Sequence, residues 1–221
     1  MSRAIFMASG IFFLLCACLF GAAETLAWPM AWAVLGLNLA SKVAGFVFAA
    51  LDLIKERAKP GSGVDPVDRL ISAIGYPGLY PGSFQMAGLD AVRLGPALHF
   101  PDVVRLSVLL VFAIGYSMAT WAMLCIPFFS TFVRIQADRG QRVISSGPYG
   151  QVRHPGYAGV LLAHLALPAA LDSIWVYVPA VLGAAFFVRR TAREDRTLID
   201  HLDGYREYRT RIHWRLLPGV W

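Results

Sequence analysis

The stretch Leu106–Val133, LSVLLVFAIGYSMATWAMLCIPFFSTFV, contains no charged residue. A helix needs roughly 20 consecutive apolar residues to cross the hydrocarbon of a bilayer, so this stretch is long enough to span one. Charge is also absent from four further stretches, which are Ala4–Ala23, Thr25–Ser41, Leu70–Leu89 and Tyr157–Ala170. The sequence therefore predicts an all-α, polytopic transmembrane helical bundle.

The composition agrees with a chain that is embedded in lipid. Of its 221 residues, 57% are hydrophobic and only 15% are charged, whereas about 25% are charged in a typical soluble domain. Basic loops that stay in the cytoplasm and contact anionic lipid explain the net charge of +6. We therefore expect the bilayer as a partner and no nucleic acid.

The cysteines give no sign of a metal site or of disulfides. Cys16, Cys18 and Cys125 all lie in apolar stretches. No spacing of Cys and His is typical of zinc, and no paired framework is typical of a secreted fold. We expect three small packing residues and no bound metal.

The uncharged stretches predict about six spans, with both termini in the cytoplasm. The predicted spans are Ala4–Ala23, Pro29–Leu53, Leu70–Leu89, Val103–Phe128, Tyr157–Leu171 and Ser173–Val188. The first exceeds the 7–15 apolar residues of a signal peptide, so we expect it to stay uncleaved. The third contains Pro77-Gly78 and Pro81-Gly82, which predict a broken helix.

The basic loops around Lys55–Lys59 and Arg134–Arg153 predict the orientation. The positive-inside rule places both loops in the cytoplasm, which requires an even number of crossings between them. Leu70–Leu89 must then cross the bilayer; the alternative is that it lies at the surface and one basic loop faces outward. Lys42, inside the second span, either faces the bundle interior or extends its ammonium towards the interface.

The most informative polar motif is Arg153-His154-Pro155-Gly156-Tyr157-Ala158-Gly159, called here the RHPG motif. Pro155 is expected to begin a helix, where its missing N–H costs nothing. Arg153 and His154 then lie at a helix N-terminus, which favours an anion such as a carboxylate. Tyr157 falls in the first turn, and Gly159 permits a close approach of backbone or ligand. The alternative interpretation is an interfacial Arg/Tyr anchor.

A second charged cluster, Arg189–Arg196, follows the last span. The last two spans form a hairpin, so this cluster is expected to return beside the RHPG motif. Glu194 and Asp195 can hold an ammonium or sulfonium, and Arg190 can hold a carboxylate. The alternative is a solvated charged face that anchors the span.

The tail contains Tyr205, Tyr208 and Arg211, spaced three apart, so a helix would place them along one face. Aromatic faces attract a sulfonium, but they suit the depth of lipid headgroups equally well.

As a set, these residues resemble the isoprenylcysteine carboxyl methyltransferase family and its phospholipid-methylating relatives. The resemblance covers about Phe128–Trp221 and rests on Gly147-Pro148-Tyr149, the RHPG motif, Arg190-Thr191, Glu194-Asp195, Leu198, Tyr205, Tyr208 and Pro218. A weaker likeness covers Asp52–Arg57. The resemblance implies a helical membrane bundle with its site at the cytoplasmic face, where S-adenosylmethionine enters from the cytosol and a lipid-like acceptor from the bilayer.

The resemblance also implies roles for individual residues and a division of the chain. The cofactor pocket would be lined by His154, Tyr157, Gly159, Glu194, Tyr205 and Tyr208. Arg190 would lie near the acceptor carboxylate at the reaction centre, and Arg153 is also assigned to catalysis. The family often has two consecutive glutamates, and here the second position is the shorter Asp195. Residues 1–102 would form an N-terminal membrane region, and residues 103–221 a methyltransferase-like region.

The implied activity is methyl transfer to a hydrophobic or lipidated acceptor, with a carboxylate favoured, in an integral protein of the cell inner membrane. In-line methyl transfer needs positioning more than a strong acid or base, which agrees with the lack of a catalytic triad motif. A phospholipid amine and a small thiol are alternative acceptors. Two alternatives from other classes are a non-enzymatic lipid-binding protein and an NADPH-dependent membrane reductase of the steroid 5-reductase type. Such reductases resemble this motif but have asparagine and glutamate where this chain has Gly156 and Val160.

Overall fold

The computed structural model describes residues 2–58, 64, 66–94 and 99–221, and all the regular structure in them is helical. The α-helices are α1 (Ser2–Ala23), α2 (Pro29–Phe48), α3 (Leu51–Ala58), α4 (Pro66–Leu89), α5 (Asp102–Cys125), α6 (Pro155–Ala170), α7 (Tyr177–His201) and α8 (Tyr205–Arg211). A π-helical turn, η1 (Asp90–Leu94), follows α4, and short 3₁₀ turns form η2 (Ala137–Arg139) and η3 (Gly147–Gly150). The prediction of an all-α fold is confirmed.

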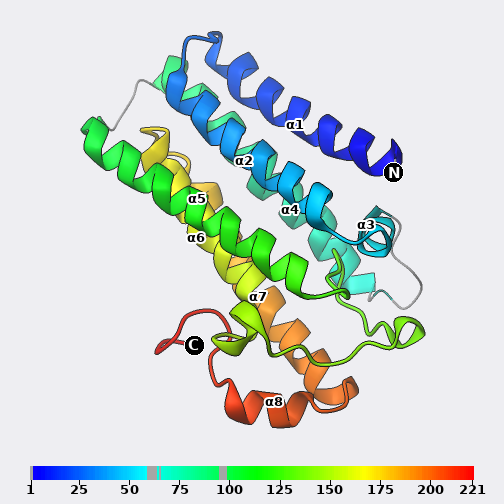
Figure 1. Ribbon diagram of the computed structural model, residues 1–221. Helices are drawn as coiled ribbons and strands as arrows, with labels where there is room; N and C mark the ends of the chain where they lie inside the picture. The colour runs from blue at the N-terminus through cyan, green and yellow to red at the C-terminus, as the bar shows by residue number, and fades with distance from the viewer. Residues whose placement is uncertain (1, 59–63, 65, 95–98) are drawn as a thin grey trace.

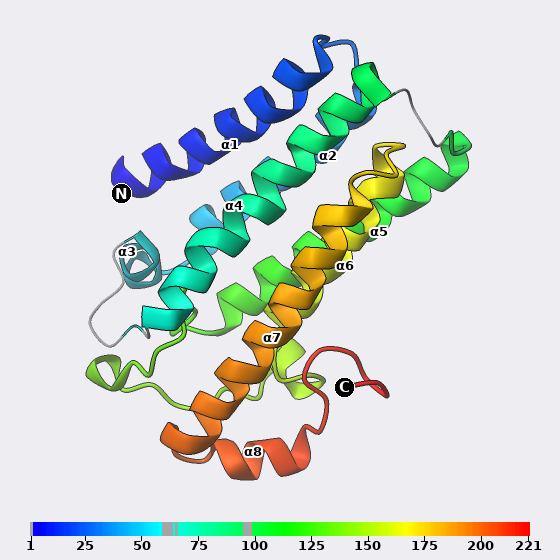
Figure 2. The same cartoon turned by 180° about the vertical axis from the view of Figure 1, so that it is seen from behind.

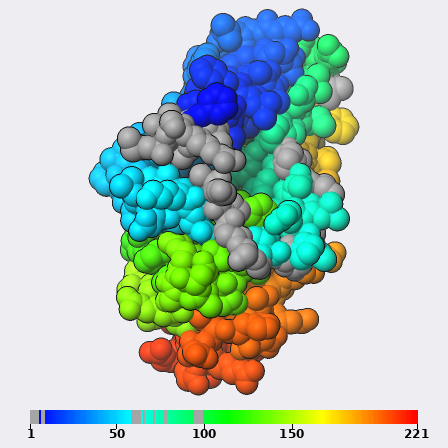
Figure 3. Space-filling model, turned by 90° about the vertical axis from the view of Figure 1, so that its right-hand side faces the viewer, coloured from blue at the N-terminus to red at the C-terminus, as the bar shows by residue number. Residues whose placement is uncertain are grey.

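The long helices lie side by side, and the polar segments gather at one end of the bundle (Figure 1). That end contains α3, the connection between α5 and α6, the last turns of α7, and α8. Both basic loops lie there, because Arg134 after α5 forms an ion pair of 2.8 Å with Glu56 of α3. A topology of six spans requires both basic loops to lie at the same end of the bundle. The space-filling view shows an elongated molecule with α1 at one end and the last turns of α7 with α8 at the other (Figure 3).

Helix α4 corrects one expectation from the sequence. It runs as one α-helix from Pro66 to Leu89, through both Pro-Gly pairs, so the prediction of a broken third span is wrong. A proline removes one intrahelical hydrogen bond, but a helix can continue when neighbouring helices support it. Helix α4 has such support, because it packs against α1 on one side and α7 on the other (Figure 2).

The helix ends follow the local sequence. Pro155 occupies the first turn of α6, directly after His154, as predicted. The predicted second span, Pro29–Leu53, is two helices: α2 ends at Phe48, where Ala49 is extended, and α3 begins at Leu51. Helix α7 continues well beyond the predicted end of its span at Val188 and therefore carries the charged cluster on a rigid helix.

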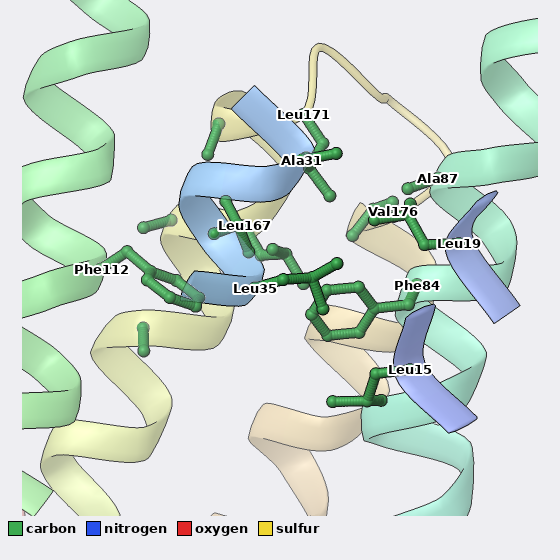
Figure 4. Close-up of a cluster of buried hydrophobic side chains, with 14 of the residues drawn as sticks. Leu15, Leu19, Ala31, Leu35, Phe84, Ala87, Phe112, Leu167, Leu171 and Val176 are labelled. Atoms are coloured by element: carbon green, nitrogen blue, oxygen red, sulfur yellow. The ribbon is translucent and has the colours of Figure 1, made fainter. Parts of the chain in front are cut away.

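One hydrophobic core joins the two halves of the chain. Leu15 of α1, Leu35 of α2 and Phe84 of α4 meet Leu167 of α6 and Val176, which precedes α7 (Figure 4). All five side chains are buried. The division at residue 102 stays a prediction, and this core holds the two halves together.

The outer faces of the helices are apolar. By length and composition, α2 and α5 could each cross a membrane, and Ser9–Ala23 and Pro155–Ala170 are apolar but shorter. Large side chains are exposed on these helices, including Phe13 (69%), Phe48 (73%) and Leu110 (62%). Apolar surface of this extent is unfavourable in water and favourable in lipid. It supports a membrane-embedded bundle, and the count of six spans stays a prediction.

Candidate functional site

A cavity of about 110 Å³ opens at the polar end of the bundle, where the connection between α5 and α6 faces α7 and α8. This volume exceeds the space needed by a single water molecule, so the cavity has room for part of a ligand. Six of the residues assigned to the site from the sequence line it, namely Arg153, His154, Tyr157, Glu194, Tyr205 and Tyr208. The fold therefore brings the RHPG motif, the charged cluster and the tail together, as the hairpin argument predicted.

Asp195 is the centre of one hydrogen-bond network, the Asp195 network. Arg153 donates to both carboxylate oxygens, from Nε at 2.8 Å and from Nη2 at 3.0 Å. Tyr205 donates at 2.9 Å and Arg215 Nε at 2.8 Å, and His154 Nε2 lies 3.4 Å away. Asp195 is fully buried. Arg153 and His154 thus bind an anion at the start of α6, as expected, but that anion is a carboxylate of the protein.

The network determines the ionisation of Asp195. Burial alone would raise its pKa, but hydrogen bonds from His154, Arg153 and Arg215 outweigh burial and hold the pKa well below its ordinary value. Burial and the neighbouring Asp195 carboxylate raise the pKa of Tyr205. Asp195 is therefore an acceptor only, and Tyr205 stays a donor.

Hydrogen bonds to main-chain carbonyls attach the C-terminal tail to the start of α6. Arg153 Nη1 donates to the carbonyls of Ile212 and His213, each at 2.8 Å. The amides of Arg153 and His154 donate to the carbonyls of Trp214 and Arg215, each at 2.9 Å. The tail thus covers the start of α6, and Asp195 fixes its position.

Arg190 is the centre of a second network, the Arg190 network, which joins α4, α6 and α7. Its guanidinium donates to Ser72 Oγ, to Asp68 Oδ2 at 3.3 Å and to the Thr131 carbonyl at 2.6 Å. Its Nε donates to Tyr157 Oη at 2.8 Å. Arg190 is 2% exposed and is not among the residues that line the cavity. Its contact with an acceptor carboxylate stays a prediction, since protein groups engage its donors here.

Tyr157 connects the Arg190 network to the cavity. Its hydroxyl accepts from Arg190 and donates to Glu194 Oε2 at 2.5 Å. Glu194 is half-buried and lines the cavity, so its other oxygen remains available to a ligand. The Tyr157 hydroxyl therefore joins Arg190 to the Glu194 carboxylate, which faces the cavity.

Gly159 does not line the cavity. It lies where α6 crosses α5, and a Cβ atom at this position would come within 2.7 Å of the Ala119 amide. Gly159 therefore permits a close approach of two helices, which is common in membrane bundles. Its role in the cofactor pocket stays a prediction, and Gly156, which does line the cavity, was not among the predicted site residues.

Other parts of the site were missed because their sequence signal is weak. Asp68 and Ser72 occupy the first turns of α4 and bind an arginine more than a hundred positions away. Phe129 and Gln136 line the cavity from a connection without regular repeat. Only the polar start of an otherwise apolar helix could have indicated Asp68. Among the described residues, no cluster of His, Cys, Asp and Glu is suited to a metal.

Part of the chain is similar to known proteins. Residues 107–200 match the model of the isoprenylcysteine carboxyl methyltransferase (ICMT) family. The chain is 33% identical over 90 residues to the Delta(14)-sterol reductase TM7SF2 of Mus musculus. The aligned stretch makes up 39% of this chain and 22% of that protein. It is 32% identical over 102 residues to the Lamin-B receptor of Drosophila melanogaster (43% and 13%), and 30% identical over 90 residues to the Delta(14)-sterol reductase of Methylotuvimicrobium alcaliphilum (39% and 21%).

The chain spans about a fifth or less of the length of these curated relatives. The family match includes the RHPG motif, Arg190 and Glu194, and it agrees with the apolar helices in indicating an integral membrane protein. Over residues 107–200, less than half of its length, the chain is similar to the isoprenylcysteine carboxyl methyltransferase family.

Proposed function

We propose that this protein is a membrane methyltransferase that uses S-adenosylmethionine and a hydrophobic or lipidated acceptor. The observation that carries the proposal is the convergence of six predicted site residues on one cavity, four of them inside the family region 107–200. The cavity lies at the polar end of the bundle, which we assign to the cytoplasmic face of the inner membrane.

The chemistry of the lining suits this cofactor. Glu194 offers a carboxylate to the ammonium or the ribose hydroxyls, and exposed Arg142 can pair with the cofactor carboxylate. Tyr157 and Phe129 present aromatic rings, which attract a sulfonium. When bound, S-adenosylmethionine supplies an electrophilic methyl group. The protein holds Glu194 through Tyr157 and covers the site with the tail that Asp195 fixes.

A carboxylate is the acceptor group that we favour. An ionised carboxylate is already a nucleophile, so the protein need only orient it and exclude water. A phospholipid amine or a small thiol is the alternative acceptor.

The curated relatives favour one second candidate, a membrane sterol reductase, because two of them are named Delta(14)-sterol reductases. The geometry at Gly156 argues for the methyltransferase. A Cβ atom at Gly156 would lie 3.0 Å from the ring of Phe129, so the asparagine of the reductase-like motif would require this ring to shift slightly.

Replacing Glu194 with glutamine should weaken the binding of S-adenosylhomocysteine. The substitution removes one charge from the cavity, and a hydrogen bond to a charged group is worth about 1.5–3 kcal/mol. We therefore expect the Kd to rise at least tenfold in isothermal titration of the detergent-solubilised protein. Glu207→Gln, at an exposed position of α8, is the matched control. An unchanged Kd in Glu194→Gln would remove this carboxylate from the cofactor site.

A further inference from the structure

Two cationic side chains in the bundle, Arg57 of α3 and Lys42 of α2, have no acidic partner. Across the residues that the structure describes, neither forms an ion pair or a hydrogen bond, and Nη1 of Arg57 is buried and unpartnered. The acidic residues of α3 are engaged elsewhere: Glu56 pairs with Arg134 and Asp52 with Lys55. We call Arg57 and Lys42 the inner cation pair.

The three fully buried arginines of the described chain differ from the half-buried Arg57 in this respect. Arg134 has two carboxylate partners, Arg153 binds Asp195 with two donors, and Arg190 binds Asp68. An uncompensated charge inside a membrane bundle is expensive, so such residues mark sites for ions or substrates. Unlike these three arginines, Arg57 keeps a buried donor that no residue in the described part of the chain engages.

Arg57 lies beside the candidate site. Its guanidinium carbon is 5.2 Å from the ring centre of Phe129, which lines the cavity and packs against Gly156. Tyr157, whose hydroxyl is bonded to Glu194, lines the same cavity as Phe129. An anion on Arg57 would thus be adjacent to the wall of the cavity.

Lys42 extends the positive region further into the bundle. Its ammonium lies 5.9 Å from the ring centre of Tyr80 and 5.7 Å from that of Tyr116, so it faces α4 and α5. Asn38 fixes Tyr116 by a hydrogen bond of 2.7 Å. The Lys42 side chain is exposed, so a ligand can reach it.

We propose that the inner cation pair binds the carboxylate of the hydrophobic methyl acceptor and holds it beside Tyr157. This inference rests on the proposed function and adds the group that recognises the acceptor. Arg190, whose donors are engaged by Asp68, Ser72 and Thr131, then acts as a positioning residue for Tyr157 and Glu194.

The test compares a carboxylate with its neutral counterpart in the full-length, detergent-solubilised protein. The probes are N-acetyl-S-farnesylcysteine and its carboxamide, and binding is measured by isothermal titration with and without S-adenosylhomocysteine. Arg57→Gln should weaken binding of the carboxylate at least tenfold and change binding of the carboxamide and of S-adenosylhomocysteine less than twofold. Arg57→Lys should keep most of the preference for the carboxylate, and Lys42→Gln should lose part of it.

Lys55→Gln is the matched control, because Lys55 lies on the same helix and its side chain is 72% exposed. An equal loss for both probes, or no loss for the carboxylate, would overturn the proposal. So would displacement of the carboxylate by phosphatidylglycerol at equal concentration, since the pair would then hold an anionic lipid. If the wild type binds no S-adenosylhomocysteine but keeps an Arg57-dependent preference for the carboxylate, the proposed function fails and the anion site stands.

Discussion

Replacing Asp195 with alanine is expected to lower the free energy of unfolding by about 3–5 kcal/mol, the usual cost of removing one partner of a buried ion pair. The substitution leaves Arg153 buried without its counter-charge and frees the donors of Tyr205 and Arg215. The C-terminal tail should also detach from the start of α6. Thermal unfolding of the solubilised protein measures the first effect, and limited proteolysis of the tail measures the second.

Asp200→Ala is the control for this result, because Asp200 is exposed on the same helix. Since the pKa of Asp195 is lowered on folding, its contribution to stability is present above the ordinary aspartate range and is lost as the pH falls below it. Equal unfolding temperatures for the two variants at neutral pH would show that the Asp195 network does not stabilise the fold.

Replacing Arg190 with lysine is expected to reduce turnover about thirtyfold. An ammonium cannot reproduce the fork that reaches Ser72, Asp68 and Tyr157 together. Loss of one hydrogen bond to a charged group costs about 2 kcal/mol, which corresponds to this factor when the bond positions reacting groups. Methyl incorporation from labelled S-adenosylmethionine into a prenylcysteine acceptor is the measurement.

The cofactor itself should still bind to Arg190→Lys, with at most a modest increase in Kd, because Glu194 remains in place. Arg196→Lys, at an exposed position of α7, should keep the parental rate. A parental rate in Arg190→Lys would show that the Arg190 network does not position the site.

The sequence predicted those parts of the site that depend on neighbouring segments of the chain. Pro155 begins α6 because proline suits the first helical turn, and the hairpin of the last two spans brings Glu194 to the RHPG motif. Both inferences need only short-range geometry. The prediction failed for Pro77 and Pro81, because packing of α4 against two neighbours overrides a local tendency to break.

Pairings between distant segments could not be predicted. Nothing in the sequence around Asp68 indicates that it binds Arg190, since that contact exists only after α4 packs against α7. The positive-inside rule treated Arg57 as one more basic loop residue. In the structure its guanidinium lies over Phe129, and the acidic groups of its own helix pair with Lys55 and Arg134.

Parallel isothermal titration of the solubilised wild-type protein with S-adenosylhomocysteine and with NADPH tests the central claim most directly. The proposed methyltransferase should bind S-adenosylhomocysteine with a one-to-one stoichiometry, and NADPH should give no saturable heat. Glu194→Gln should weaken binding of S-adenosylhomocysteine, which would assign that binding to the cavity where the connection between α5 and α6 faces α7 and α8. Saturable binding of NADPH without binding of S-adenosylhomocysteine would contradict the account and identify the cavity as that of a reductase.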